Sequence, residues 1–479
     1  MVPKNVRVRA APSPTGFLHI GTARTALFNY LFAKRYGGAF ILRIEDTDPG
    51  RSEKRFVSDI LESLRWLGIH WDEGPEKKGE FGPYVQSERI GLYREHLSRL
   101  IDAGKAYFCF CTKEELEAQK AHLMASGLPP RYSGRCSHLT KEEAGQKRKD
   151  EIPSVVRFRA EARRVSFTDL VKGKIEVDMG LMGDFTIAKS FEEPLYNFAA
   201  AIDDVQMKIT HVIRGEDHIS NTPKQILIQE ALGFSSPLYA HLPLILGPDK
   251  SKLSKRHGAA SVQEYRDQGY LPEALVNFIA FLGWNPGGER ELFSLSELER
   301  EFDIRRAHKA NAVFNVQKLD WFNAHYIRHT APEELAALCE QYVPPNTQRE
   351  KLIKVVALEK ERLKKLSDIA TLADFFFSPP EYPAGMLVWR NSSKEATERS
   401  LPETRDALSR LSEEAFTAEA VKEALSVLIS RFGNGEIYWP LRVALSGKDA
   451  SPGPSEIAEV LGKEETLARV DEALKKLRE

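Results

Sequence analysis

The feature that most constrains the fold is a proline- and glycine-rich loop between a predicted strand and a predicted helix near the start of the chain. The strand is expected at residues 6–10, the loop reads PSPTGFLHIGT at 12–22, and an apolar-rich helical pattern covers 22–36. Such a loop lies at a helix N-terminus, where unpaired N–H groups and the positive end of the helix dipole bind phosphate. Gly21 allows close approach of the backbone, and His19 can hydrogen-bond a phosphate oxygen.

A second motif, the basic run KLSKR at 252–256, follows a strand predicted at 242–246. Its Lys252 and Lys255 can set positive charge against a phosphorus atom from which pyrophosphate leaves. Proline- and glycine-rich turns are common, and a lone basic run is more often a solvated loop. The two motifs in this order, each beside a predicted strand, favour a triphosphate site.

Length and composition are those of a large water-soluble protein. The chain has 479 residues, enough for about three or four domains, and 42% of them are apolar. Because 68 basic residues face 69 acidic ones, RNA binding would have to come from local patches and shape. No segment approaches the roughly 18 uninterrupted apolar residues of a membrane-spanning helix, and the N-terminus reads as a charged strand rather than a signal sequence. We therefore expect a cytoplasmic protein without membrane contact.

Alternating strands and helices predict an α/β fold with a parallel, doubly wound sheet. Further strands are expected at 38–46 and 208–214, and the latter is followed by a helix with Pro223 in its first turn. Between these units, residues 107–190 have a different texture, with charged helical stretches and a strand-like segment at 155–159. The nucleotide-binding fold is therefore expected to be split by an insertion.

Three of the four cysteines lie with one histidine inside 30 residues, namely Cys109, Cys111, Cys136 and His138. Three cysteines and a histidine form a complete tetrahedral zinc set without an open position, which indicates a structural metal. The alternative reading of each cysteine is a small buried hydrophobe. That reading is preferred for Cys339, which stands apart on an amphipathic helical pattern.

The two loops together resemble the signature motifs of class I aminoacyl-tRNA synthetases, and further runs resemble the bacterial glutamyl-tRNA synthetases in particular. These runs are RIEDTD at 43–48, YNFA at 196–199, IDD at 202–204, HVIRGEDH at 211–218 and NTP at 221–223. The resemblance covers the whole chain. It implies that ATP with Mg²⁺ converts L-glutamate to glutamyl-adenylate, which then reacts with the 3′-terminal adenosine of tRNA-Glu. The cysteine spacing resembles the zinc-bearing branch of the family.

The resemblance also implies a domain plan for a monomer. A split Rossmann-like catalytic domain is expected, with an inserted acceptor-stem-binding domain that carries the zinc and an all-α stem-contact and anticodon-binding region. The expected parts are 1–106 and 191–260 for the catalytic halves, 107–190 for the insertion, 261–330 for stem contact and 331–479 for anticodon binding.

A dicarboxylic amino acid calls for fixed guanidinium groups and one acid, and the resemblance assigns such residues. For glutamate they are Arg9, Ala11, Ser13, Glu45, Tyr196 and Arg214. For ATP they are His19, Gly21, Asp217, Ile245, Lys252 and Lys255, with His19 and Lys255 as the catalytic groups. Glu45 and Arg214 also end predicted parallel strands, where open α/β sheets bind ligands. The chain departs from many relatives at Glu192–Leu195 and Ala200, which replace a Gly, a Pro-Thr and an Asn.

The last third of the chain has a helical Leu/Ala/Lys/Glu periodicity from about residue 332 onward. This pattern predicts a helical anticodon-binding cage and not the β-barrel of glutaminyl enzymes. By resemblance, the anticodon contacts are Arg362, at the third base, with Arg442, Ser451, Pro452 and Pro454. Without the resemblance, the charged run 359–362 would be a solvated helix face.

We therefore predict a glutamate–tRNA ligase that discriminates against tRNA-Gln. One alternative is a relaxed enzyme that also charges tRNA-Gln with glutamate. A paralogue that glutamylates a queuosine base lacks the C-terminal cage, and the roughly 150 mainly helical residues after 330 argue against it. A catalytically silent, tRNA-binding regulatory relative is a third alternative. It is disfavoured because His19, Glu45, Arg214 and Lys255 are intact.

Overall fold

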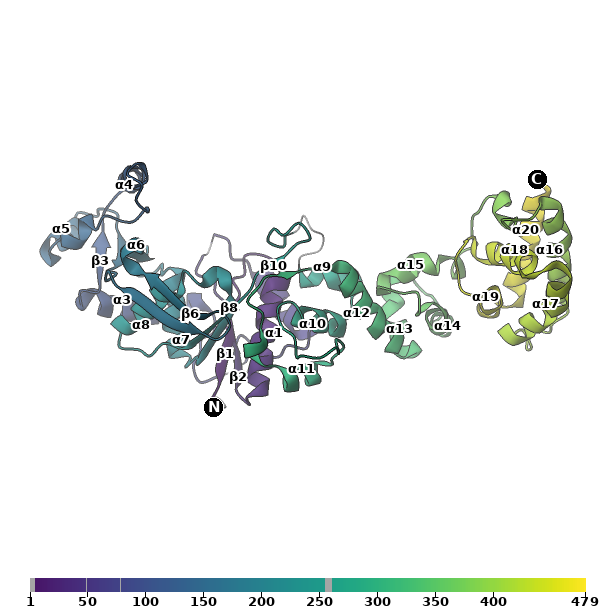
Figure 1. The fold of residues 1–479 in the computed structure, drawn as a ribbon, viewed down its shortest axis with the longest axis horizontal. Helices are drawn as coiled ribbons and strands as arrows, with labels where there is room; N and C mark the ends of the chain where they lie inside the picture. Colours follow the sequence, from purple (N-terminus) through teal and green to yellow (C-terminus); the bar gives the residue numbers. More distant parts are fainter. Residues whose placement is uncertain (1–4, 49, 78, 255–260) are drawn as a thin grey trace. The chain divides into compact units, whose positions relative to one another are not determined.

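The computed structural model describes residues 5–48, 50–77, 79–254 and 261–479, whose elements are drawn in Figure 1. The chain divides into two compact units. The first comprises Met1–Asp267 and Pro272–Val316, and the second comprises Gln268–Leu271 and Gln317–Glu479. The first unit is mixed α/β, whereas the second is helical.

A parallel sheet in the first unit confirms the predicted doubly wound α/β fold. Strand β1 (Arg7–Ala10) pairs with β2 (Ala39–Leu42), and β8 (His211–Gly215) pairs with β9 (Leu238–Leu242), each pair in parallel. The Thr210 N–H donates to the Arg7 carbonyl at 2.9 Å, which sets β8 beside β1.

Two helices connect these strands and determine where a ligand can enter. Helix α1 (Ile20–Arg35) leads from β1 outward to β2, and α8 (Thr222–Ala231) leads from β8 outward to β9 on the other side. The chain thus winds away from the β1–β8 junction in both directions. A crevice at the carboxyl ends of the strands is expected at such a switch point.

The stretch 107–190 contributes to two sheets. Strands β3 (Ala106–Cys109), β4 (Val155–Phe158) and β7 (Phe185–Ala188) form an antiparallel sheet, accompanied by α4 (Lys113–Ala125) and α5 (Lys141–Lys149). The hairpin of β5 (Arg164–Asp169) and β6 (Gly173–Asp178) instead extends the parallel sheet, because Asp169 pairs with Tyr239 of β9. The sequence did not predict this hairpin.

Helices cover the parallel sheet and form a hydrophobic core with it. They include α2 (Lys54–Trp66), α3 (Ile90–Asp102) and α7 (Tyr196–Gln206), whose Phe198 and Ile202 are fully buried against Val212 of β8 and its neighbours. Three helices of the same unit lie in sequence between the two strands of a short parallel pair, β10 (Ile245–Leu246) and β11 (Ala312–Val313). These are α9 (Val262–Asp267), α10 (Pro272–Ala280) and α11 (Leu295–Glu301), the last with a capping box at Ser294.

Every regular element that the structure describes within 317–479 is a helix, as predicted. The longer helices are α12 (Val316–His329), α13 (Pro332–Cys339), α14 (Arg349–Glu359), α16 (Lys394–Ser409), α17 (Ala418–Phe432), α18 (Asn434–Ser446), α19 (Pro454–Leu461) and α20 (Lys463–Arg478). Each turns an apolar stripe inward, as the burial of Leu335, Val356, Leu441 and Val470 shows. None of the helices described in either unit combines the length and apolar composition that a bilayer span requires.

Candidate active site

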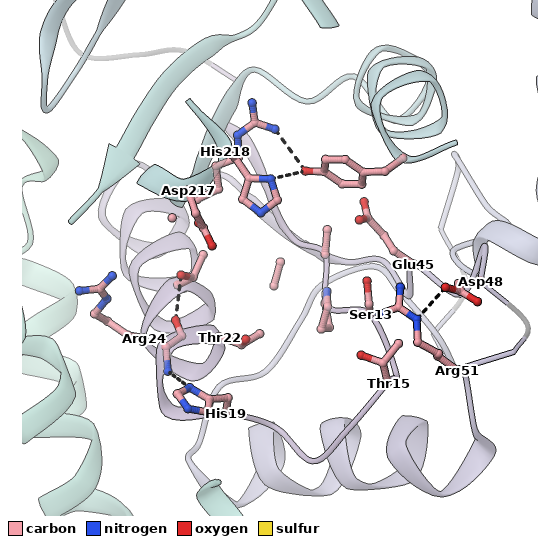
Figure 2. A pocket seen from close by; sticks show the side chains of 18 of the residues that line it. Ser13, Thr15, His19, Thr22, Arg24, Glu45, Asp48, Arg51, Asp217 and His218 are labelled. Atoms are coloured by element: carbon pink, nitrogen blue, oxygen red, sulfur yellow. Dashed lines mark hydrogen bonds and ion pairs between the residues drawn. The ribbon is translucent and has the colours of Figure 1, made fainter. Parts of the chain in front are cut away.

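A cavity of about 1010 Å³ opens at the carboxyl ends of the parallel strands, at the switch point described above (Figure 2). It brings together all the residues predicted for glutamate and ATP that the structure describes. They are Arg9, Ala11, Ser13, His19, Gly21, Glu45, Tyr196, Arg214, Asp217, Ile245 and Lys252. Lys255 lies outside the described residues.

His19 caps the N-terminus of α1 with its side chain. Its Nδ1 atom accepts a hydrogen bond from the Gly21 N–H at 3.1 Å, so the ring proton belongs on Nε2. Burial and then the charge of Lys252 lower the pKa of His19, which keeps the ring neutral. His19 therefore presents an N–H donor to the cavity beside the free amides of the first helical turn, as binding of an oxyanion requires.

Arg214 ends β8 and is held from several sides by neutral groups. Its Nη2 donates to the Thr222 hydroxyl at 2.6 Å, and its Nη1 donates to Gln225 at 2.9 Å and to the Tyr196 hydroxyl at 3.4 Å. The Tyr196 hydroxyl in turn meets His218 Nδ1 at 3.0 Å (Figure 2). Because no carboxylate neutralises Arg214 among these partners, its charge remains for a ligand.

His218 lines the same cavity, although the sequence assigned it no role. Burial and then the charge of Arg214 lower the pKa of His218 to about 4. The ring is therefore neutral near pH 7, and its Nδ1 serves as the acceptor for Tyr196. The signal in the sequence was its position directly after Asp217, in the HVIRGEDH run.

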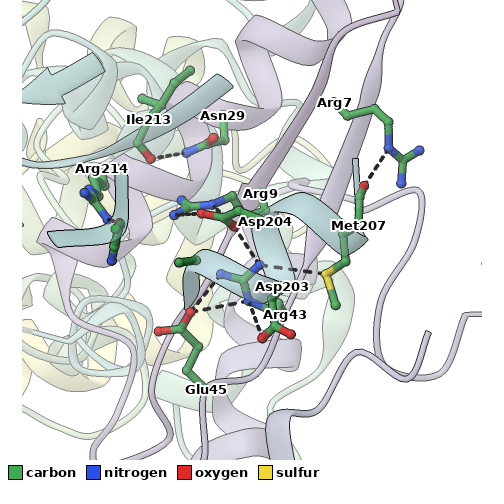
Figure 3. A network of polar contacts seen from close by, with 12 residues as sticks. Arg7, Arg9, Asn29, Arg43, Glu45, Asp203, Asp204, Met207, Ile213 and Arg214 are labelled. Atoms are coloured by element: carbon green, nitrogen blue, oxygen red, sulfur yellow. Dashed lines mark hydrogen bonds and ion pairs between the residues drawn. The ribbon is translucent and has the colours of Figure 1, made fainter. Parts of the chain in front are cut away.

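Glu45 and Arg9 lie in a buried network with alternating charge (Figure 3). Arg9 makes a two-point contact with Asp204, with Nε–Oδ1 at 2.9 Å and Nη2–Oδ2 at 3.3 Å. The fully buried Arg43 donates to Asp204 at 2.8 Å and to Glu45 Oε1 at 2.9 Å. No hydrogen bond to Glu45 Oε2 occurs among the described residues, so this oxygen remains for an ammonium group.

The charges of this network nearly cancel. Arg43 and Arg89 contact Asp203, and together with Arg9 and Arg214 they set four guanidinium groups against the carboxylates of Glu45, Asp203 and Asp204. Within this set Arg214 has no carboxylate partner, so its charge suits a carboxylate of a ligand, whereas Glu45 suits an ammonium group. A dicarboxylic amino acid with one ammonium group is thus the type of ligand that this end of the cavity balances.

At the other end of the cavity, Lys252 and Asp217 form an ion pair at 3.3 Å, and both side chains are substantially exposed. An exposed pair of this kind is weak, so Lys252 can exchange Asp217 for a phosphate group. The assignment of both residues to ATP stays a prediction.

Three of the four predicted zinc ligands come together in the stretch after β3. The sulfur atoms of Cys109, Cys111 and Cys136 lie within 4.8 Å of one another, and the sulfurs of Cys111 and Cys136 are 3.6 Å apart. Tetrahedral zinc with Zn–S bonds near 2.3 Å separates its sulfurs by about 3.8 Å. His138 is exposed and does not belong to this group.

Tyr132, which the sequence did not single out, occupies the position beside the three sulfurs. Its hydroxyl lies 3.4 Å from the sulfur of Cys109 and 3.4 Å from that of Cys111. It also accepts a hydrogen bond from the Cys136 N–H at 2.9 Å. A tyrosine four residues before a cysteine gives no recognisable metal pattern in a sequence, so only the fold brings it to the cluster.

In the second unit, the predicted anticodon residues also gather. Arg442 Nη1 donates to the Ser451 carbonyl at 2.6 Å, to the Ser451 hydroxyl at 2.8 Å and to the Pro452 carbonyl at 3.1 Å. Arg362 Nη2 donates to the Ala450 carbonyl at 3.1 Å, and Pro454 begins α19.

Arg362 does not lie on a solvated helix face, since α14 ends at Glu359. Glu359 is fully buried and accepts a hydrogen bond from Arg362 Nη1 at 2.7 Å. Within the charged run, Glu359 therefore holds the Arg362 side chain in place.

Comparison with known proteins agrees with this arrangement. Residues 5–321 match the family described as "tRNA synthetases class I (E and Q), catalytic domain", and residues 334–474 match "Anticodon binding domain". A protein of Carboxydothermus hydrogenoformans named Glutamate--tRNA ligase is 46% identical, over 97% of this chain and 99% of its own length. Its namesake from Moorella thermoacetica is 43% identical, over 99% of both chains. The crystal structure of a glutamate tRNA ligase from Elizabethkingia meningosepticum in complex with its amino acid has a TM-score of 0.89 and 37% identity, covering 99% of this chain and 100% of that one. The chain therefore belongs to the glutamate–tRNA ligases, a family of class I aminoacyl-tRNA synthetases.

Proposed function

We propose that this protein activates L-glutamate with ATP and transfers the glutamyl group to the 3′-terminal adenosine of tRNA-Glu. The observation that carries the proposal is the cavity that Arg9, Arg214 and Glu45 line together with the N-terminus of α1. The first three side chains suit a dicarboxylic amino acid, and the helix N-terminus suits a triphosphate.

In this proposal Arg9 and Arg214 bind the carboxylates of glutamate, and Glu45 binds its ammonium group. Tyr196 adds a hydroxyl, and Ala11 and Ser13 line the loop beside it. The buried partners of these side chains fix them before the substrate arrives, which reduces the entropy lost on binding.

Activation then requires positioning and charge stabilisation. The α-carboxylate of glutamate attacks the α-phosphorus of ATP in line, the new C–O–P bond forms, and the bond to pyrophosphate breaks. The N–H of His19 and the charges of Lys252 and Lys255 stabilise the negative charge that develops on the phosphate oxygens. Gly21, Asp217 and Ile245 complete the nucleotide site, and Mg²⁺ enters with ATP and neutralises part of the phosphate charge.

We also propose a structural zinc site formed by Cys109, Cys111 and Cys136. The spacing of the three sulfurs suits zinc, and the Phe110 N–H donates to the Cys136 sulfur at 3.4 Å, a contact that stabilises a thiolate. The hydroxyl of Tyr132 supplies the fourth donor in place of His138. Such a closed site stabilises the fold of the insertion and takes no part in the chemistry.

The second unit would read the anticodon. Arg362, Arg442, Ser451, Pro452 and Pro454 would form the contact surface, with Arg362 at the third base. Glu359 restrains Arg362 at 2.7 Å, so its orientation toward RNA is largely fixed before binding. A fixed polar contact can favour the C that ends the tRNA-Glu anticodon over the G that ends that of tRNA-Gln.

The activation step is tested by glutamate-dependent ATP–pyrophosphate exchange, measured with and without tRNA-Glu. Lys255→Ala should lose exchange by roughly a hundredfold or more, because removing one preorganised charge from such a transition state typically costs about 3–4 kcal/mol. Glutamate binding should largely survive. A variant with near-normal exchange would refute the assignment of Lys255, and a wild-type protein inactive under both conditions would favour the silent relative.

A further inference from the structure

Behind Arg214 lies a buried pair that no catalytic step above uses, formed by His241 of β9 and Asp169 at the end of β5. The His241 Nδ1 atom and the Asp169 Oδ2 atom are 2.7 Å apart, and both side chains are fully buried. The other ring nitrogen of His241 faces Arg214. Its Nε2 lies 3.2 Å from Arg214 Nε and 3.0 Å from the Thr222 hydroxyl.

The donors and acceptors of this chain permit only one proton arrangement. Arg214 Nε carries a hydrogen and cannot accept, so His241 Nε2 must be the acceptor. The ring proton therefore lies on Nδ1 and is donated to the Asp169 carboxylate. The partner of one imidazole nitrogen thus sets the role of the other. Here the Asp169 carboxylate at Nδ1 makes Nε2 an acceptor for Arg214.

Asp169 divides its two oxygens between two tasks. Oδ1 accepts from the N–H groups of Val171 at 2.9 Å and Lys172 at 2.8 Å, which closes the β5–β6 turn. Oδ2 accepts from His241 Nδ1 and from the His241 backbone N–H at 3.0 Å. One oxygen therefore maintains the hairpin, and the other fixes the histidine.

We propose that Asp169 and His241 are positioning residues for glutamate recognition, in which Asp169 holds His241 in the tautomer that accepts from Arg214 Nε. With Gln225 and Tyr196 on Nη1 and Thr222 on Nη2, Arg214 is then restrained at each nitrogen, and one N–H, on Nη2, has no partner among the described residues. This inference rests on the proposed role of Arg214 as a ligand of glutamate.

The pair also ties the pocket to the inserted stretch. Asp169 belongs to the β5–β6 hairpin, whereas Arg214 belongs to the parallel sheet. A displacement of the hairpin would therefore change the acceptor that Arg214 meets.

The decisive variant is Asp169→Asn in the full-length protein. Its carbonyl oxygen can replace Oδ1 and keep the turn, while its NH₂ group would face His241 Nδ1 and drive the ring proton to Nε2. A proton on Nε2 would face the Arg214 Nε–H, so two donors would meet. Replacing the carboxylate beside a catalytic histidine by an amide stabilises the wrong tautomer in the same way. The glutamate KM in ATP–pyrophosphate exchange with tRNA-Glu should rise about tenfold to a hundredfold, the loss typical of one hydrogen bond to a charged group.

Three readouts separate positioning from a merely structural role. The ATP KM of Asp169→Asn should stay close to the wild-type value, and its melting temperature should fall only as far as loss of the hydrogen bond from the His241 backbone N–H to Oδ2 explains. ¹⁵N NMR of histidine-labelled protein should report that the His241 proton has moved from Nδ1 to Nε2. An unchanged glutamate KM would overturn the proposal, and so would a rise in both KM values together with a fall in melting temperature.

Two variants at His241 provide a second test if Asp169→Asn folds poorly. In His241→Gln, the amide oxygen can replace Nε2 and accept from Arg214. In His241→Asn, the shorter amide can replace only Nδ1 and donate to Asp169, so Arg214 loses its acceptor. We expect His241→Gln to retain glutamate affinity better than His241→Asn, and the reverse order would overturn the proposal. Arg214→Ala distinguishes the proposed role of Arg214 in glutamate binding from the positioning role of Asp169 and His241. If it leaves the glutamate KM unchanged, the proposed function of Arg214 fails; if it alone raises this KM, only the positioning role fails.

Discussion

Asp204 shows at the scale of one residue how the pocket is preorganised. It accepts hydrogen bonds from both Arg9, which lines the cavity, and Arg43, which also donates to Glu45. Burial alone would raise the pKa of Asp204, but the two guanidinium groups outweigh it and lower the pKa to about 2. The carboxylate therefore stays charged and keeps two functional side chains in place.

Asp204→Asn should destabilise the first unit and weaken glutamate binding together. Breaking a buried ion pair typically costs about 3–5 kcal/mol, because its partner charges remain buried. Urea unfolding should show this loss at pH 7.5. Glu176→Gln is the control, since it breaks the exposed pair with Arg164 and should cost less than about 1 kcal/mol.

The destabilisation by Asp204→Asn should depend on pH. The folded-state pKa of Asp204 lies below the ordinary value of 3.8, so its stabilising contribution is present above that value and disappears as the pH falls toward 2. The difference in unfolding free energy between wild type and Asp204→Asn should therefore be constant from about pH 7.5 to 5 and shrink only below about pH 4. A difference that already declines between pH 7 and 5 would contradict this account.

Arg362 carries the residue-scale prediction for RNA. Arg362→Gln should raise the glutamylation of tRNA-Gln relative to tRNA-Glu by roughly tenfold to a hundredfold, since one polar base contact discriminates by about 1–3 kcal/mol. The measurement is the ratio of kcat/KM for the two transcripts. An unchanged ratio would mean that the guanidinium group only pairs with Glu359.

At the scale of elements, the cysteine cluster joins β3 to the turn that carries Tyr132 and Cys136. We predict about one zinc per protein when chelators are omitted during purification, and release of that zinc by Cys136→Ser. Loss of the metal should disorder this part of the insertion and raise the KM for tRNA more than the KM for ATP. Protein that contains no zinc would remove the prediction.

The fourth ligand can be tested with a matched pair of variants. Tyr132→Phe removes only the hydroxyl beside the sulfurs and should weaken zinc binding about tenfold or more, as measured by competition with a chromogenic chelator. His138→Asn should leave the affinity unchanged, because His138 is exposed outside the cluster. The opposite outcome would restore the ligand set that the sequence predicted.

Local patterns predicted those elements that depend on neighbouring residues. The predicted strand–loop–helix unit is present at Arg7–Arg35, because hydrophobic periodicity and turn residues act within short segments. The β5–β6 hairpin was missed, since its pairing with β9 depends on contacts between segments far apart in the sequence. For the same reason the sequence showed neither the Arg9–Asp204 contact nor the approach of Tyr132 to the cysteines.

At the scale of the whole molecule, the cavity and the predicted anticodon surface lie in different units of the chain. In the proposed function, the cavity would select the amino acid by charge, whereas Arg362 would select the tRNA by one base. The two selections can therefore be measured independently. Arg362→Gln should change the tRNA preference without changing the glutamate KM.

The most direct test of the central claim is to charge tRNA-Glu and tRNA-Gln transcripts side by side, each with glutamate and with glutamine. We predict efficient glutamylation of tRNA-Glu and roughly tenfold to a hundredfold weaker glutamylation of tRNA-Gln. We expect no product with glutamine, which lacks the second carboxylate that the arginines bind. Equal glutamylation of both tRNAs would establish the relaxed-specificity alternative, and attachment of glutamine, or of neither amino acid, would contradict the account.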